Sequence, residues 1–304
     1  MSKQRSLFQQ FNYAINENFK EGRDKHAEKK ADPELTEKIY SYSSMNNLKD
    51  FSKNLSNFFK ENNPDIKRIG DIKESNLQDF LNAKKEEGCS QNTLNMYRSN
   101  INKLEQIVNK TFNSVRWDVK DLETPISPKK IDPSRGAQNP ISREDYNKIL
   151  DYFKENKSAS GDAILAQNGL GLRVEELAQI KVKNVDLEKG ELKFSNTKGG
   201  KELTKNINNI KDVLMRNMDG KNPEDKIFNI KSGSINKQLN RVEDKLGLTR
   251  HSTHDIRRLL AQEKYDSCRE QGMSKQESLA VTSKFLNHIT PRERMLTKSY
   301  IIIH

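Results

Sequence analysis

The sequence predicts a mainly helical protein of two domains with a small β-sheet in the second domain, which is an α+β fold class. Over most of the chain, apolar residues recur at intervals of three and four, the spacing of amphipathic helices. Between residues 118 and 140 four prolines and several basic residues interrupt this pattern, which indicates an extended linker. Residues 190–207 alternate between apolar and polar side chains around a Lys-Gly-Gly-Lys turn, which predicts a β-hairpin.

Before the linker, helices are expected near residues 6–30, 46–61, 75–87 and 90–108. Each carries leucine or aromatic side chains on one face, so these faces form the core of a helical bundle. The dipeptide Asp32-Pro33 ends the first stretch. We therefore expect residues 1–40 to be a helical extension and residues 41–117 to be a compact helical domain.

After the linker, Ser142 and Asp145 have the spacing of a helix N-cap followed by an acidic first turn. The second domain is expected to begin here and to occupy residues 141–304. Apart from the hairpin, this part of the sequence predicts helices joined by short loops.

The composition favours a polyanionic partner. The net charge is +11 and the pI is about 9.4, which favours nucleic acid first and anionic lipid second. A lysine-rich protein with no such partner explains the charge equally well. No apolar run is long enough to span a membrane, and Cys89 and Cys268 stand far apart without metal-ligand neighbours. We expect a cytoplasmic protein with no membrane contact and no metal site.

Several candidate catalytic residues lie in the second domain. Arg173 follows two glycines at the start of a helical run, and Glu176 lies one helical turn further on. His254 and Arg257 have the i, i+3 spacing that places two side chains on one face of a helix. The other candidates are Lys198 in the hairpin turn, His288 and Tyr300. Taken singly, each of these candidates is more simply explained as a surface or core residue.

In this order, the six positions resemble the active-site signature of the tyrosine recombinase family, which includes the phage integrases. The resemblance covers the second domain, and the helices of residues 41–117 look like the family's SAM-like core-binding domain, which clamps DNA. Residues 171–177 match the family's box around its first arginine, and residues 254–257 and 286–288 match its two histidine boxes. Lys198 corresponds to the family's hairpin lysine, with Lys201 as the competing position.

The resemblance implies a role for each residue. Arg173, supported by Glu176, and Arg257 hold the scissile phosphate, and His288 donates a further hydrogen bond. His254 helps to take the proton from Tyr300, the nucleophile, and Lys198 protonates the departing 5′ oxygen. No metal, ATP or other cofactor is needed. Positively charged residues that we expect to contact DNA are Lys53, Lys84, Lys85, Arg98, Lys103, Lys129, Lys130, Lys201, Arg250 and Arg258.

The implied function is site-specific integration or excision of a mobile element through a 3′-phosphotyrosyl intermediate. The protein would bind double-stranded DNA as a homotetramer, together with accessory DNA-bending or directionality factors. It would be associated with the nucleoid. Three features depart from the family: Arg258 replaces a common histidine, Asn287 replaces glycine, and the interval from His288 to Tyr300 is longer than usual. A type IB topoisomerase, a telomere resolvase and a catalytically silent DNA-binding relative are the alternatives.

Two further segments leave alternatives open. The short stretch of residues 1–30 is expected to add a helix to the first domain, although integrases often have a separate DNA-binding domain there. The three isoleucines after Tyr300 are expected to pack either on their own domain or on a neighbouring subunit. Tyr265 lies among apolar residues and is expected to be a packing residue.

Overall fold

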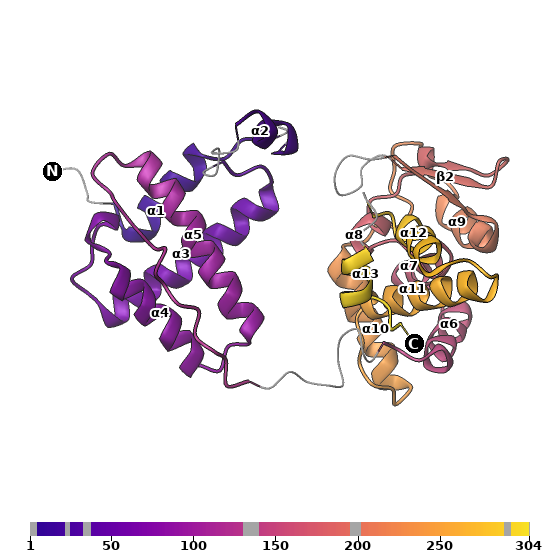
Figure 1. The fold of residues 1–304 in the computed structure, drawn as a ribbon. Helices are drawn as coiled ribbons and strands as arrows, with labels where there is room; N and C mark the ends of the chain where they lie inside the picture. Colours follow the sequence, from indigo (N-terminus) through magenta and orange to yellow (C-terminus); the bar gives the residue numbers. More distant parts are fainter. Residues whose placement is uncertain are drawn as a thin grey trace. The chain divides into compact units, whose positions relative to one another are not determined.

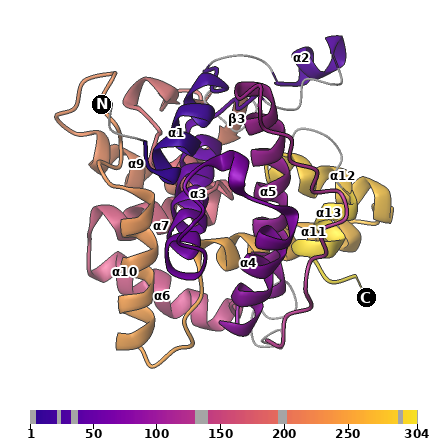
Figure 2. The same ribbon diagram turned by 90° about the vertical axis from the view of Figure 1, so that its left-hand side faces the viewer.

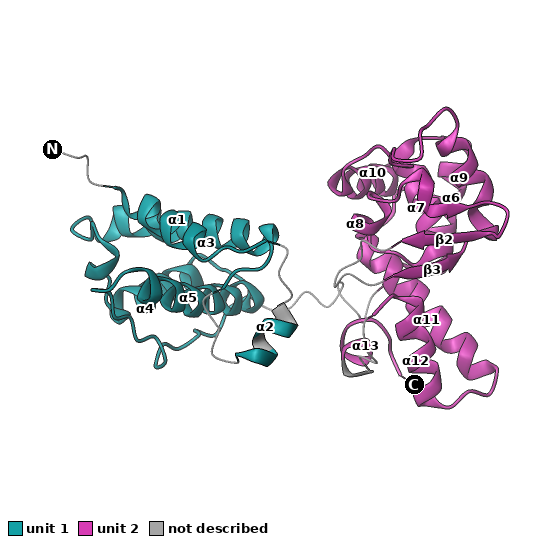
Figure 3. Ribbon diagram, turned by 90° about the horizontal axis from the view of Figure 1, so that it is seen from above, with its two compact units in different colours: residues 1–131 teal, residues 132–304 magenta. Residues whose placement is uncertain are grey.

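A computed structural model describes residues 5–21, 25–32, 38–129, 140–194, 202–288 and 293–303. The chain divides into two compact units, residues 1–131 and residues 132–304 (Figures 1 and 3). The described part is mostly helical, with three short strands in the second unit. No helix in these described ranges is both long enough and apolar enough to cross a membrane.

The first unit is a helical bundle. Its helices are α1 (Leu7–Glu17), α2 (Lys25–Ala31), α3 (Tyr42–Asn62), α4 (Glu74–Glu86) and α5 (Gln91–Thr111), with a short 3₁₀ turn at Ile69–Asp71. Helix α1 packs on α3 and α5, and α4 packs on α5 (Figure 1). Its core is formed by the apolar faces of these helices, with Phe11, Leu55, Phe59, Phe80 and Leu104 among the fully buried side chains. These faces are the ones that the sequence periodicity predicts.

The first predicted helix, residues 6–30, is wrong in its extent. Helix α1 ends at Glu17, because the buried Asn18 turns its side chain back onto the carbonyl of Ala14 and onto the Thr111 hydroxyl, at 2.9 Å each. Phe19 then pairs with Ile39 in an isolated parallel bridge. The segment that follows Glu17 is therefore fixed by contacts distant in sequence, which helical periodicity does not reveal.

The beginning of the predicted linker, residues 118–140, packs on the first unit. Val119 and Leu122 are buried in its core, and Arg98 donates hydrogen bonds to both of their carbonyl oxygens. Further along, Ser127 donates from its hydroxyl to the carbonyl of Cys89 at 2.6 Å. The part of the linker that contains Lys130 lies outside the described residues.

The second unit surrounds its core with helices. They are α6 (Arg143–Glu155), α7 (Ala159–Leu170), α8 (Val174–Leu177), α9 (Lys211–Met218), α10 (Ser232–Lys245), α11 (Thr253–Glu270), α12 (Lys275–Phe285) and α13 (Glu293–Ser299), with 3₁₀ turns at Val182–Asn184 and Asn208–Ile210. Helix α6 begins as predicted, because the Ser142 hydroxyl accepts a hydrogen bond from the Asp145 backbone at 3.0 Å. Helix α10 runs along α6 and α7 (Figure 2).

A small antiparallel sheet completes the second unit. Its strands are β1 (Val185–Asp186), β2 (Glu191–Phe194) and β3 (Leu203–Asn206), in the order β1-β2-β3. Strands β2 and β3 pair from Glu191 with Asn206 to Phe194 with Leu203, which confirms the hairpin predicted over residues 190–207 (Figure 3). The hairpin turn, with Lys198 and Lys201, lies outside the described residues.

Candidate active site

Arg173 is placed by the sharp turn between α7 and α8. Gly171 caps α7 with a φ of +61°, and a Cβ atom on it would lie 2.6 Å from the ring of Phe285, so glycine is needed here for both reasons. Arg173 is then the residue that precedes α8. The Glu176 carboxylate accepts hydrogen bonds from the Arg173 backbone at 2.8 Å and from its guanidinium at 3.0 Å. Glu176 thus contacts both the backbone and the side chain of Arg173.

Arg257 projects from α11 into the interior beside Arg173 and is only 1 % exposed. Its guanidinium donates to the carbonyl oxygen of Gly171 at 2.9 Å and to that of Leu286, and it lies 3.8 Å from the Glu176 carboxylate. Burial, and the positive charge of Arg173, lower the pKa of Arg257 to about 10. The guanidinium therefore stays charged at neutral pH, in an environment that favours binding an anion.

His254 stands in the first turn of α11. The start of this helix is fixed by Asn236, whose side-chain oxygen accepts hydrogen bonds from the backbone and the hydroxyl of Thr253, both at 3.0 Å. Part of the His254 side chain is open to solvent. Partial burial, and then the charges of Arg258 and Arg257, nevertheless lower its pKa to about 4. His254 is therefore neutral at neutral pH and is able to accept a proton.

His288 follows the end of α12. Asn287, which replaces the family's usual glycine, has a φ of +53°, and the His288 backbone N–H donates to the carbonyl of Ser283 at 3.0 Å. Asparagine tolerates this left-handed conformation better than most residues. The substitution therefore preserves the turn that presents His288.

Tyr300 comes directly after α13 and is 6 % exposed. Its ring lies edge-on to two imidazoles, with centroids 5.0 Å from His254 and 5.4 Å from His288. The Arg257 guanidinium carbon is 5.9 Å from the Tyr300 ring centroid. Two residues of α11 and one that follows α12 therefore meet around one tyrosine.

A cavity of about 210 Å³ opens beside this group. It is lined by Arg173, His254 and Arg257, together with polar residues such as Gln167, Asn236 and Thr253. This is a suitable environment for a phosphate group, because two guanidinium groups and an imidazole line one small, polar cavity.

Lys205 was not predicted. It lies on β3, two residues after the buried Leu203, and its ammonium donates to the carbonyl of Phe285 and lies 4.5 Å from that residue's ring centroid. Burial, and then the positive charge of Arg257, lower its pKa to about 8. Neither the predicted Lys198 nor Lys201 falls within the described residues.

The predicted DNA-contacting residues of the first unit differ in their surroundings. Arg98 is engaged with backbone carbonyls, Lys103 donates to the carbonyl of Lys38 at 2.8 Å, and Lys84 pairs with Glu87 at 2.8 Å. Lys53 and Lys129 are exposed, and Lys85 lies 3.3 Å from Glu86. In the second unit, Arg250 forms two hydrogen bonds with Asp244, and Arg258 pairs with Asp255.

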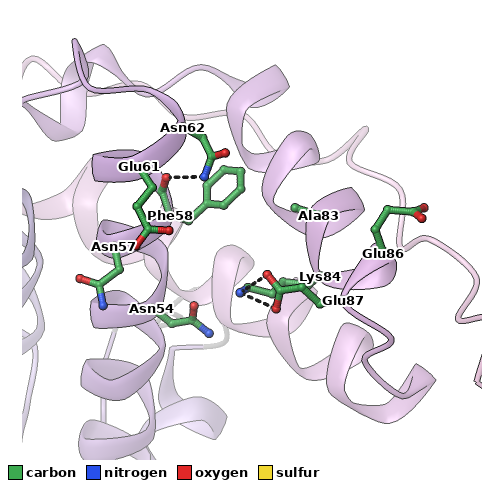
Figure 4. Close-up of a pocket in the computed structure, with 9 residues that line it drawn as sticks. All are labelled: Asn54, Asn57, Phe58, Glu61, Asn62, Ala83, Lys84, Glu86 and Glu87. Atoms are coloured by element: carbon green, nitrogen blue, oxygen red, sulfur yellow. Dashed lines mark hydrogen bonds and ion pairs between the residues drawn. The ribbon is translucent and has the colours of Figure 1, made fainter.

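A second cavity, of about 650 Å³, lies between α3 and α4 of the first unit (Figure 4). Glu61, Glu86 and Glu87 line it, and the Lys84 charge is balanced by Glu87. This excess of negative charge disfavours phosphate binding. The cavity between Arg173 and His254 is therefore the better phosphate site.

Comparison with known proteins agrees with this geometry. Residues 139–270 match the sequence profile of the phage integrase family. Tyrosine recombinase XerA of Saccharolobus solfataricus is 32 % identical over 102 residues, which are 33 % of this chain and 34 % of the relative. Residues 139–270 therefore belong to the phage integrase family. This confirms the resemblance inferred from the sequence.

Other similarities concern part of the chain or its fold. XerA of Pyrococcus furiosus is 29 % identical over 113 residues, 36 % of this chain and 37 % of the relative. The chain thus matches about a third of the length of these curated relatives. A lambda integrase dimer bound to a COC′ core site has a TM-score of 0.60 at 16 % identity, covering 92 % of this chain and 75 % of that one. The Tn1549 transposon integrase in complex with transposon right end DNA has a TM-score of 0.58 at 15 % identity, covering 96 % and 94 %.

These two structures share the fold, which confirms the predicted class, mainly helical with a small sheet. The isoleucine tail and Tyr265 also have a position within this integrase fold. Ile301 is 2 % exposed and packs with Tyr265, Leu296 and Tyr300 in one apolar cluster of the second unit. Tyr265 is a packing residue, as predicted.

Proposed function

We propose that this chain is a site-specific DNA recombinase that cleaves and rejoins strands through Tyr300. The observation that supports this most strongly is the convergence of Arg257, His254 and His288 on the ring of one tyrosine, next to the cavity lined by Arg173. Preorganised cations stabilise the charge that develops on a phosphate as a nucleophile adds to it. Tyr300 is the group in this cluster that is able to form a phosphoester.

In the proposed reaction, the Tyr300 oxygen forms a bond to the scissile phosphorus as the bond to the 5′ oxygen breaks. Arg173 and Arg257 hold the non-bridging oxygens, and His288 donates a hydrogen bond to them. His254 accepts the tyrosine proton, for which its lowered pKa of about 4 keeps it neutral. Lys198 supplies a proton to the 5′ oxygen, a role that rests on the family resemblance.

Rejoining is the reverse of this step. The 5′ hydroxyl of a second strand attacks the 3′-phosphotyrosyl ester, releases Tyr300 and restores a phosphodiester. The ester keeps the energy of the original bond, so the proposed cycle uses no ATP. The charge compensation comes from side chains, so the proposed cycle uses no metal ion either.

Double-stranded DNA is the proposed substrate, and a homotetramer on two DNA sites is the proposed working assembly. Lambda integrase has been solved as a tetramer bound to a Holliday junction, in a structure with a TM-score of 0.62 and 15 % identity to this chain. The net charge of +11 supports a polyanionic substrate. Integration or excision of a mobile element, nucleoid association, and accessory DNA-bending or directionality factors belong to the same proposal.

Covalent trapping on DNA tests this function. The probe is a library of duplexes with randomised sequence around a nick, so that the cleaved fragment is lost by diffusion and the protein–DNA ester accumulates. Wild type should form complexes that survive SDS in the presence of EDTA, and Tyr300→Phe should form none. Tyr265→Phe is the matched control, since it removes a buried hydroxyl from the same apolar cluster and should react like wild type.

Persistent adducts with Tyr300→Phe would contradict the proposed nucleophile. DNA binding by wild type without any adduct would instead favour a catalytically silent DNA-binding protein. Relaxation of a plasmid by wild type, without strand transfer between two of the selected sites, would favour a topoisomerase.

A further inference from the structure

The polypeptide on both sides of Tyr300 is held by side chains of α11. Arg258 donates from Nε to the carbonyl oxygen of Ser299 at 2.9 Å. Gln262 uses both ends of its amide on Ile302: its Nε2 donates to the Ile302 carbonyl at 3.1 Å, and its Oε1 accepts from the Ile302 N–H at 2.7 Å. These three hydrogen bonds bracket the nucleophile, one residue before it and two residues after it.

Both of these side chains are themselves oriented by neighbours on α11. Arg258 also donates to Asp255 at 2.6 Å, and the Gln262 amide donates to Asp266 at 2.9 Å. Asp255 in turn accepts hydrogen bonds from the backbone and the hydroxyl of Ser252, just before the helix begins. Arg258 and Gln262 are therefore held in place along the helix surface.

The spacing on α11 connects this arrangement to the chemistry. His254, Arg258 and Gln262 are four residues apart, so they follow one another along a single face of the helix, with a rise of about 6 Å at each step. The first contacts the ring of Tyr300, and the other two bind the backbone around it. One helix face thus carries both the proton acceptor and the anchor of the nucleophile.

An apolar contact fixes the same segment from the other side. Ile301 is 2 % exposed and packs with Leu296 and Tyr265, and the N–H groups of Tyr300 and Ile301 both donate to the Leu296 carbonyl. With its backbone fixed on both sides, Tyr300 moves its hydroxyl mainly by rotation about its own side-chain bonds. Such a restriction favours a correctly aligned attack.

We propose that Arg258 and Gln262 are positioning residues for cleavage, forming a backbone clamp that holds Tyr300 against His254. This inference rests on the proposed function, because it assigns the clamp a purpose in the attack of Tyr300 on DNA. The clamp uses a residue that departs from the family, since Arg258 stands where relatives often have histidine. It also explains how a tyrosine close to the carboxyl end is held inside its own unit.

Three substitutions, two at Gln262 and one at Gln271, separate positioning from simple stabilisation. Gln262→Leu removes both hydrogen bonds to Ile302, whereas Gln262→Glu keeps the acceptor for the Ile302 N–H and loses the donor. Gln271→Leu is the matched control, because Gln271 is an exposed glutamine at the end of the same helix and lies outside the clamp. Each variant is assayed for single-turnover adduct formation, for DNA affinity, and for hydrogen–deuterium exchange over residues 295–303 in the free protein.

The clamp predicts that Gln262→Leu slows adduct formation roughly 10- to 100-fold, the range expected when a reacting group is misplaced by about 1 Å. The DNA affinity of Gln262→Leu should stay within about twofold of wild type, since Gln262 is not among the residues expected to contact DNA. Gln262→Glu should give an intermediate rate, and Gln271→Leu should match wild type. Exchange over residues 299–303 should rise in Gln262→Leu.

A wild-type rate of adduct formation in Gln262→Leu would overturn the positioning role, whether or not exchange increases. Unchanged exchange over residues 299–303 would show that the clamp is not formed in solution. If wild type gives no adduct at all, the proposed function fails and the positioning role fails with it. The exchange measurement would then still report whether the clamp exists, so the two failures are distinguishable.

Discussion

Replacing the Glu176 carboxylate with an amide (Glu176→Gln) should destabilise the second unit, because this carboxylate offsets two neighbouring positive charges. It accepts hydrogen bonds from the backbone and guanidinium of Arg173, and its other neighbour is the buried Arg257 at 3.8 Å. Glutamine has nearly the same shape, so packing is retained. The substitution removes the negative charge and turns one acceptor into a donor that faces other donors.

The expected cost follows from these contacts. A hydrogen bond to a charged group contributes about 1.5–3 kcal/mol, and removing one partner of a buried pair costs about 3–5 kcal/mol. The Arg173 side chain is 27 % exposed, so solvent screens part of its interaction and the estimate moves to the lower end. We expect a loss of about 3 kcal/mol, which corresponds to roughly 10 °C in melting temperature for a unit of this size.

Urea unfolding provides the assay, and the chain contains its own internal reference. Its one tryptophan, Trp117, is buried in the core of the first unit, so tryptophan emission follows that unit, whereas far-ultraviolet circular dichroism follows both. The transition of the second unit is the one that appears in circular dichroism but not in tryptophan emission. Glu176→Gln should lower the urea concentration at the midpoint of this transition. Glu175→Gln changes the exposed carboxylate next in sequence and should stay within about 0.5 kcal/mol of wild type. A loss in Glu176→Gln as small as in Glu175→Gln would refute the reasoning.

Three further predictions follow from shifted pKa values. At subsaturating DNA, the rate of adduct formation should be constant above about pH 6 and should fall as the pH decreases towards 4, because His254 has a pKa of about 4 and becomes protonated there. If the rate of His254→Gln falls over the same pH range, another group causes the decrease. Burial raises the pKa of Glu243 to about 7, so the folded state holds an extra proton between pH 4.5 and 7 and stability falls as pH rises through that range. Glu243→Gln should therefore have a higher melting temperature than wild type at pH 8 and the same melting temperature as wild type at pH 4.5. A variant that melts at the same temperature as wild type at both pH values would contradict this. The pKa of Lys205 is lowered to about 8, so its positive charge disfavours folding below that pH. Lys205→Met should therefore raise the melting temperature at pH 7. A gain of the same size at pH 10 would contradict this explanation.

Much of the architecture could be predicted from local patterns. The apolar stripes predict the helices of the bundle, the Ser142 cap predicts the start of α6, and the alternation around residues 190–207 predicts the paired strands. These features depend on neighbours close in sequence, so they are legible without a structure. The end of α1 at Glu17 is different, because it depends on contacts from Asn18 to Thr111, far along the chain.

The site shows the same division. The sequence singles out Arg173, His254, Arg257 and His288 as candidates because each lies in a box whose turn or helix spacing is local. The surroundings of Lys205 and Glu243 were not predicted, since a strand or helix pattern gives the face on which a charged side chain lies but not the carbonyl or amide that it contacts. The clamp at Ile302 also depends on a contact across forty residues of sequence separation.

The central claim is that Tyr300 lies among the cations that activate a DNA phosphate, and identification of the adducted residue tests it most directly. Wild-type protein is trapped on the nicked duplex library, digested with protease and nuclease, and analysed by mass spectrometry. The mass of the residual nucleotide should be located on Tyr300 alone. A nucleotide on Tyr265 or on any other side chain, with Tyr300 unmodified, would contradict the account.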